Sequence, residues 1–552
     1  MSAATSTAAR TSKTVQSTAL RNASSGYGIM VRFILRRNWL RMLIWLVALA
    51  GMIVLVIESQ RTAFPTAEDR EAYAQIANSP AVAALTGLPY AAATLGGILN
   101  IKIWMTIAVA LSFAVIFMVT RNGRTEEEEG RTEILRAGVL GTHAYSLASW
   151  SVFSGFSVLV GLATAAGAIS QGLPVEGAVL MGASFSATAL VFLGVSAIAG
   201  QLTVTGSGAN TLASAVLGVS FLIRAVADLQ AEGETPAWFA WLSPIGWAQQ
   251  SRSYGENNWW PLLLCVGVAA LLCWVALMLE PNRDLGAGLI PERVGPRSAS
   301  AALRTQLGLT IRLQRASLIG WTIGIVVFAA FFGGVASAVV DVFPEDGPIA
   351  DLMLGGSTSV LDGMFGLFLM MNAVLIGAFV LKSADAIRAE ESAGRTEMQW
   401  SSAISRVRWA AWRMLVPAVW SLVLLGINGA LLGGIFGFVT EQSGQVSRFF
   451  LAAIAYWPSA LLIIGVVVLC AAVIPRAASA VTWGFYGVVA ILSILGDLFG
   501  LPDWVVNNTP FSAIPRLDAE LTLLPLLTIT AIAVILSGIG LSVLHRRDMT
   551  SA

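Results

Sequence analysis

The sequence predicts an all-α polytopic membrane protein, in which twelve transmembrane helices form two tandem six-helix repeats with short cytoplasmic coupling helices. Two observations predict this fold class: the hydropathy of the chain and an internal repeat. Of the 552 residues, 56% are hydrophobic and only 12% are charged. Soluble domains carry about 25% charged residues, and disordered chains are poor in apolar residues. Both classes are therefore excluded.

Apolar runs long enough to cross a bilayer recur along the chain, since a membrane-spanning helix needs about 20 such residues. In the first half, the spans are predicted at residues 39–58, 101–120, 146–170, 178–200, 209–229 and 259–279. In the second half, they are predicted at residues 316–340, 363–381, 411–439, 450–474, 478–499 and 521–544.

The distribution of basic residues predicts the orientation, because cytoplasmic loops are enriched in Lys and Arg. With the N-terminus in the cytoplasm, most of the 33 basic residues lie on the inner side and most of the 32 acidic residues lie in outer segments. We therefore expect a multi-pass protein of the plasma membrane, surrounded by the lipid bilayer, whose N- and C-termini are both cytoplasmic.

The internal repeat is clearest in two charged segments. Residues 124–133 read RTEEEEGRTE and residues 388–397 read RAEESAGRTE, so seven of ten positions agree at an offset of 264. The same offset relates Pro261 to Pro525 and Arg283 to Arg547. Matched offsets in several parts of the chain indicate a duplication, and six spans per unit give both units the same orientation.

The repeat divides the chain into four parts. Residues 1–25 are rich in Ser, Thr and Ala and are predicted to be a disordered cytosolic tail. Residues 26–279 form the first six-helix half, 280–302 a cytoplasmic linker, and 303–552 the second half. Residues 26–37 (GYGIMVRFILRR) are predicted to be a separate amphipathic helix on the inner membrane surface.

The repeated charged segment lies between the second and third spans of each half. Glycines within it favour a turn or helix end. A solvated loop that sets the topology is one interpretation, but the positive-inside rule requires no glutamates, and both copies carry them. A protein-docking role therefore explains the repeat better. The candidate partner-binding residues are Glu126, Glu127, Gly130, Arg131, Thr132 and Glu133 in the first copy, and Glu390, Glu391, Gly394, Arg395, Thr396 and Glu397 in the second.

The chain encodes no nucleotide-binding motif of its own. A P-loop requires Gly-Lys-Ser/Thr, whereas Lys13, Lys102 and Lys382 follow Ser, Ile and Leu. The only histidines, His143 and His545, have no second metal ligand nearby in the sequence. We therefore expect no enzymatic activity, catalytic residue, metal site, cofactor or nucleic-acid partner in this chain.

The sequence resembles the permease subunits of ABC-2-type ABC exporters, most of all the double-length actinobacterial group of tetronasin-type or multidrug exporters. The resemblance rests on EEEEGRTEILRAGVLG at 126–141, EESAGRTEMQWSSAISR at 390–406 and the six-plus-six layout. It implies an interfacial helix before the first span (26–37 and 303–315). It also implies coupling helices near 124–140 and 388–404, and re-entrant hairpins at 236–250 and 503–515.

The resemblance also implies the partners of such a permease. Two cytosolic ABC ATPase domains, supplied as a homodimer of a separate chain, would bind the ATP and Mg²⁺ and dock on the coupling segments. A hydrophobic small molecule, such as a drug, an antibiotic or a lipid, would be the substrate. Ser392 and Ala393 replace the first copy's Glu128 and Glu129, so the two docking sites need not be equal.

An ion-coupled secondary transporter with two six-helix halves is the alternative. Such proteins generally couple transport through carboxylates embedded in the membrane, and the central parts of the predicted spans have none. Arg224, Asp228 and Asp497 lie near span ends. They are candidates for substrate contact, although solvated or paired charges explain them better.

Overall fold

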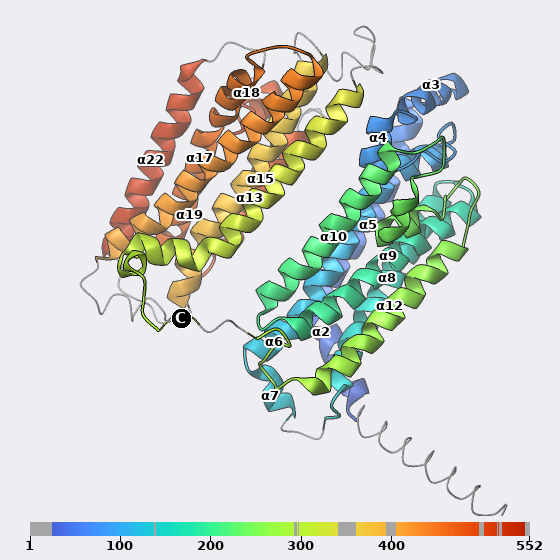
Figure 1. Cartoon of the computed structure of the whole chain (residues 1–552), viewed down its shortest axis with the longest axis horizontal. Helices are drawn as coiled ribbons and strands as arrows, with labels where there is room; N and C mark the ends of the chain where they lie inside the picture. The colour runs from blue at the N-terminus through green and yellow to red at the C-terminus, as the bar shows by residue number, and fades with distance from the viewer. Residues whose placement is uncertain are drawn as a thin grey trace, which may run out of the picture. The chain divides into compact units, whose positions relative to one another are not determined.

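The computed structural model describes residues 25–136, 140–291, 295, 297–339, 360–392, 405–495, 502–515, 517 and 522–546. Over these residues the fold is helical, apart from one isolated β-bridge between Glu232 and Thr235. The chain divides into two compact units, Met1–Val294 and Gly295–Ala552, each a bundle of long helices (Figure 1). The described helices of the first unit are α2 (Tyr27–Ala63), α3 (Ala67–Ala77), α4 (Pro80–Thr86), α5 (Leu95–Arg121), α6 (Arg124–Glu128), α7 (Arg131–Arg136), α8 (Ala144–Ser170), α9 (Val175–Leu202), α10 (Gly206–Leu229), η1 (Trp238–Leu242), α11 (Pro244–Gln249), α12 (Trp260–Leu279) and η2 (Glu280–Asn282).

The second unit begins with a short 3₁₀ helix and continues in long helices. Its described elements are η3 (Ala301–Arg304), α13 (Gln306–Val339), α15 (Val360–Ser392), α17 (Arg406–Val439), α18 (Gln445–Ile454), α19 (Trp457–Val473), α20 (Ala478–Leu495), α21 (Asp503–Val506) and α22 (Leu523–Arg546).

Eleven helices among the described residues are long and apolar enough to cross a membrane, with α18 and α19 together forming one of them. The protein is therefore an all-α, multi-pass membrane protein. Each predicted span overlaps one of these helices or α20, which is apolar but shorter. The predicted span 478–499 ends outside the described residues, so the count of twelve and the tandem repeat remain predictions.

The helix before the first span differs from our expectation. α2 runs without interruption through 37 residues, from Tyr27 to Ala63, so the separate interfacial helix predicted at 26–37 is wrong. No proline or glycine interrupts the sequence near the expected bend, and Met30, Ile34 and Asn38 are buried on one face of the same helix. Residues 306–315 are likewise the first turns of α13.

The core of the first unit is built around α9, which packs against α5, α8, α10, α11 and α12. Small residues allow this close packing: a Cβ added at Gly161 of α8 would collide with the carbonyl of Gly182 in α9. Buried hydroxyls join the same helices. Trp104 Nε1 donates to Ser184 Oγ at 2.7 Å, and Thr120 and Ser196 share a hydrogen bond of 3.0 Å.

The segment predicted as the central linker, 280–302, begins within the first unit. The backbone amide of Leu289 donates to the carbonyl of Gln201 at 3.0 Å, and that of Ile290 donates to Leu202 at 3.0 Å. These bonds attach the chain after α12 to the end of α9. This attachment brings Arg283 to the segment between α5 and α8.

Candidate functional site

The charged segment of the first unit forms two short helices, α6 and α7, between α5 and α8. Gly130 lies between them with φ +72°, a left-handed conformation that glycine adopts without the cost that a side chain would add. The break that the sequence predicted at Gly130 is therefore present. It gives α6 and α7 different surroundings: Arg124, Glu126 and Glu127 of α6 are buried, whereas Arg131, Glu133 and Ile134 of α7 are exposed.

Two asparagines fix the start of the segment. Asn38 of α2 donates through Nδ2 to Oδ1 of Asn122 at 2.9 Å, and Asn122 donates back to Asn38 at 3.4 Å. Both side chains are buried. Because a buried amide without a partner is costly, this reciprocal pair holds the end of α5 against α2.

Glu126 extends this contact to a charged group on α2. Its carboxylate accepts from Arg131 Nε at 2.7 Å and Nη2 at 2.9 Å, and it also accepts from Arg37. The Glu126 residue is 2% exposed. The hydrogen bonds to Glu126 raise the pKa of Arg131 above its ordinary value, with Glu129 contributing to the same shift. Glu126 therefore connects α2, α6 and α7.

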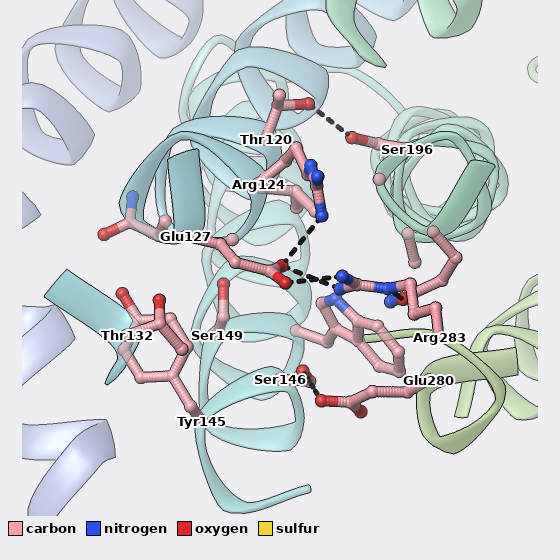
Figure 2. A pocket seen from close by; sticks show the side chains of 17 residues that line it. Thr120, Arg124, Glu127, Thr132, Tyr145, Ser146, Ser149, Ser196, Glu280 and Arg283 are labelled. Atoms are coloured by element: carbon pink, nitrogen blue, oxygen red, sulfur yellow. Dashed lines mark hydrogen bonds and ion pairs between the residues drawn. The ribbon is translucent and has the colours of Figure 1, made fainter. Parts of the chain in front are cut away.

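Glu127 joins the segment to the chain beyond α12 (Figure 2). Its carboxylate accepts from Arg283 at 2.5 and 2.7 Å and from the backbone amide of Gly286 at 2.9 Å. Arg124 lies 3.1 Å from the same carboxylate. Glu127 is 9% exposed, and a buried carboxylate is stable when its oxygens are paired and hydrogen-bonded, as they are here.

Arg124 closes the network with backbone carbonyls. Its guanidinium donates to Val204 at 2.7 Å, Gly286 at 2.8 Å and Ala287 at 3.1 Å. Glu128 accepts from the amide of Gly206, at the N-terminus of α10, at 2.8 Å. A carboxylate is favourable there because it compensates the unpaired amides and the dipole of the helix. α6 is thus attached to α2, to the α9–α10 connection and to the segment after α12.

The exposed side of the segment has a different composition. Glu128, Glu129, Arg131, Glu133 and Ile134 are exposed, and Ile134 is 76% exposed. Protein interfaces combine an apolar centre with a polar rim, and this side of the segment offers one apolar side chain with charged residues around it. We call these five residues the α7 face.

The second copy is described in part. Glu390 and Glu391 lie at the end of α15, and Glu390 forms an ion pair with Arg413 of α17. Glu390 and Glu126 thus both pair with an arginine on another helix. Gly394, Arg395, Thr396 and Glu397 lie outside the described residues.

A small polar cavity of about 50 Å³ adjoins the network (Figure 2). Its lining includes Glu127, Arg283 and the hydroxyls of Thr132, Tyr145 and Ser149, which have no partner within the described protein. One ordered water needs at least about 10–15 Å³ and two or more polar partners. The cavity therefore suits one or a few waters rather than an organic substrate.

Comparison with known proteins places the chain in a family. It is 31% identical over 528 residues to the multidrug efflux system permease protein Rv1217c of Mycobacterium tuberculosis (strain ATCC 25618 / H37Rv), covering 94% of each chain. Residues 303–544 also match the family model described as the C-terminal domain of the multidrug efflux system permease Rv1217c. The chain belongs to the Rv1217c permease family.

In this member of the Rv1217c family, Arg224 and Asp228 form an ion pair inside the first unit. Arg224 Nη1 lies 3.1 Å from Asp228 Oδ2 and donates to the carbonyl of Ala83, and Gln249 donates to Asp228 at 3.1 Å. Both charges are buried. They join α10 to α4 and α11. Asp497 lies outside the described residues.

The structure divides the predicted docking residues of this permease into two groups. Arg131 and Glu133 are exposed, whereas Glu126, Glu127 and Thr132 are buried in the first unit. We did not predict Arg283 and Arg37 as the partners of the two glutamates. The sequence held a signal for Arg283, because the pair Arg283-Asp284 recurs 264 residues later as Arg547-Asp548. Its position after the last span of the first half suggested only a linker.

Proposed function

We propose that this chain is the membrane-spanning permease of an ATP-driven exporter that moves a hydrophobic compound out of the cell. The observation that carries this proposal is the family relationship, which extends over 94% of both chains to a protein named as a multidrug efflux permease. The long apolar helices support it, because they form the membrane-spanning body that such a permease needs.

ATP would be hydrolysed by a separate chain. Nothing in the sequence has the Gly-Lys-Ser/Thr pattern of a P-loop, which supports a partner that binds the ATP and Mg²⁺. We expect two cytosolic ABC ATPase domains, as a homodimer, to dock on the two repeated segments. On the first unit, the α7 face is the surface that such a domain would reach.

The buried network gives this docking a mechanical consequence. α6 is attached by ion pairs and hydrogen bonds to α2, to the α9–α10 connection and to the chain after α12. Because Arg131 of α7 donates to Glu126 of α6, a displacement of α7 would move these parts together rather than bend a loop. A ligand shifts an equilibrium between two states only if its affinities for them differ. We therefore expect ATP binding by the partner to favour one state of the permease, and substrate to bind the inward-open state more tightly.

The proposal is tested by purifying the chain alone and with its ATPase. Alone, it should neither bind nor hydrolyse ATP; with the partner, two ATPase domains should co-purify per chain, and substrate should stimulate hydrolysis. Transport into inverted vesicles should then require ATP. If transport persists in vesicles that lack every candidate ATPase and is driven by a proton gradient, the chain is an ion-coupled secondary transporter and the proposal is wrong.

A further inference from the structure

An apolar groove lies among α17, α19 and α22 of the second unit. It has a volume of about 410 Å³, within the range of roughly 300–1,000 Å³ that is typical of ligand sites. The groove is lined by residues from all three helices: Ala411, Met414, Leu415, Ala418, Leu461, Ile464, Ala533, Val534, Ser537, Gly538 and Leu541.

The groove follows from where glycines bring helices together. α22 packs tightly on α19: a Cβ added at Gly465 would lie 2.9 Å from the carbonyl oxygen of Ala533, and one added at Gly540 would lie 2.9 Å from the amide of Leu469. Gly538 lines the groove instead, and a Cβ added there would have nothing within 4 Å. α22 is therefore close to α19 but leaves a space beside α17.

The lining indicates the chemistry of an occupant. It consists of aliphatic side chains, the thioether of Met414, one glycine and the single hydroxyl of Ser537, with no aromatic ring and no charge. Sites for polar or aromatic small molecules contain a few placed polar groups that fix the ligand's orientation. An aliphatic chain needs none of them.

The position of the groove indicates that an aliphatic occupant would come from the lipid bilayer. α17 and α22 are both candidate membrane spans. At the rim, Leu415 and Val534 are exposed, Val534 at 63%. The groove residues from Ala533 to Leu541 extend over about 12 Å at 1.5 Å per residue. Lipid tails are as apolar as leucine, so packing contacts rather than the hydrophobic effect would retain a tail in this space.

The corresponding position in the first unit carries a bulky side chain. At the offset of 264 that relates Pro261 to Pro525, Trp274 in the first half of the sequence corresponds to Gly538 in the second half. Trp274 is 57% exposed on α12. An indole thus occupies the position where the second unit has only a hydrogen atom, which distinguishes the groove from the equivalent place on α12.

We propose that the groove among α17, α19 and α22 is a lipid site that binds one acyl chain of a membrane phospholipid. This site does not depend on the export activity, and it is tested without an ATPase. The full chain is reconstituted into vesicles of phosphatidylethanolamine and phosphatidylglycerol containing a phosphatidylcholine with a mid-chain diazirine. After illumination, labelled residues are mapped by mass spectrometry.

In the wild type, label should concentrate on Ala411–Ala418 of α17 and Ala533–Leu541 of α22. Gly538→Phe and Ala411→Phe each fill the groove from one wall, and both should lose this label. Ile535→Phe is the matched control: Ile535 is an exposed residue of α22 outside the lining, and this variant should keep the groove label. Size-exclusion chromatography and thermal unfolding establish that each variant is folded.

Three outcomes would overturn the lipid site. Labelling of the groove that does not exceed labelling of the rest of α22 would mean that the tails only cover the surface. Groove label that persists in folded Gly538→Phe and Ala411→Phe would show that the lipid does not enter the space. A photo-reactive residue placed at Ala411 that crosslinks to protein rather than to lipid would show that another protein surface covers the groove.

Discussion

Individual residues in the charged segment have different roles, although the sequence presents them as one motif. Glu127 lies between Arg124 and Arg283 inside the first unit, whereas Glu133 is exposed on the α7 face. Removing one partner of a buried ion pair leaves an uncompensated charge and destabilises the fold of its own chain. An exposed glutamate costs little to change and is available to a partner.

Replacing Glu127 should therefore affect stability, and replacing Glu133 should affect assembly. Glu127→Gln leaves two buried guanidiniums without their anion, and removing one partner of a buried pair costs about 3–5 kcal/mol. Thermal unfolding of the purified permease should shift to clearly lower temperature.

Glu133→Lys should leave the unfolding temperature unchanged and reduce co-purification with the ATPase. A stable Glu127→Gln variant would contradict the buried network, and normal assembly of Glu133→Lys would exclude this part of the α7 face as the docking site.

At the scale of helices, close packing depends on which face of a helix carries its glycines. Gly155 and Gly161 both lie in α8, but only Gly161 faces the backbone of α9. Apolar composition cannot distinguish these positions, because both glycines lie in the same apolar run.

Gly161→Ala should push α8 and α9 apart, because its Cβ would collide with the carbonyl of Gly182. Overpacking of this kind costs about 1–3 kcal/mol, so the unfolding temperature in detergent should fall. Gly155→Ala, where a Cβ meets nothing within 4 Å, is the matched control and should be neutral or slightly stabilising. Equal effects of the two substitutions would be inconsistent with this helix contact.

The continuity of α2 can be measured as a distance. Spin labels at Ile29 and Leu43, both exposed, flank the bend that a separate interfacial helix would require near residue 38. In a continuous helix the two Cα atoms are separated by about 21 Å, at 1.5 Å per residue. Pulsed electron–electron double resonance should give a narrow distribution of distances between the two spin labels, consistent with this spacing. A clearly shorter distance would restore the bent arrangement that the sequence suggested.

The positions of the long helices could be predicted from sequence because twenty-residue apolar runs have few other structures available to them. The contacts of Glu126 and Glu127 could not, because Arg37 and Arg283 lie 89 and 156 residues away in the chain. The break at Gly130 was local and was predicted. The continuity of α2 was not, since an amphipathic segment can lie on a membrane or extend a span with the same sequence.

At the scale of the whole molecule, charge asymmetry makes the orientation testable. Most basic residues lie in segments that a cytoplasmic N-terminus places inside, and the loops that carry Ala72 and Glu234 are acidic. The chain near Ala299, just after the first unit, is basic, with Arg293 and Arg297 nearby. Lys and Arg are retained on the cytoplasmic side, so the first two sites should be outside and the third inside.

Single cysteines at these three positions should report this orientation. Cys265, Cys273 and Cys470 are first replaced by alanine, so that an impermeant maleimide can react only at the new site. Ala72, Glu234 and Ala299 are all exposed, so accessibility depends on the side of the membrane. Ala72→Cys and Glu234→Cys should react in intact cells, and Ala299→Cys should react only after permeabilisation. Because an even number of spans separates Ala72 from Glu234, labelling of only one of them would mean that a helix between them does not cross the membrane. Reaction of Ala299→Cys in intact cells, with the other two protected, would reverse the orientation and place the α7 face out of reach of any cytosolic ATPase.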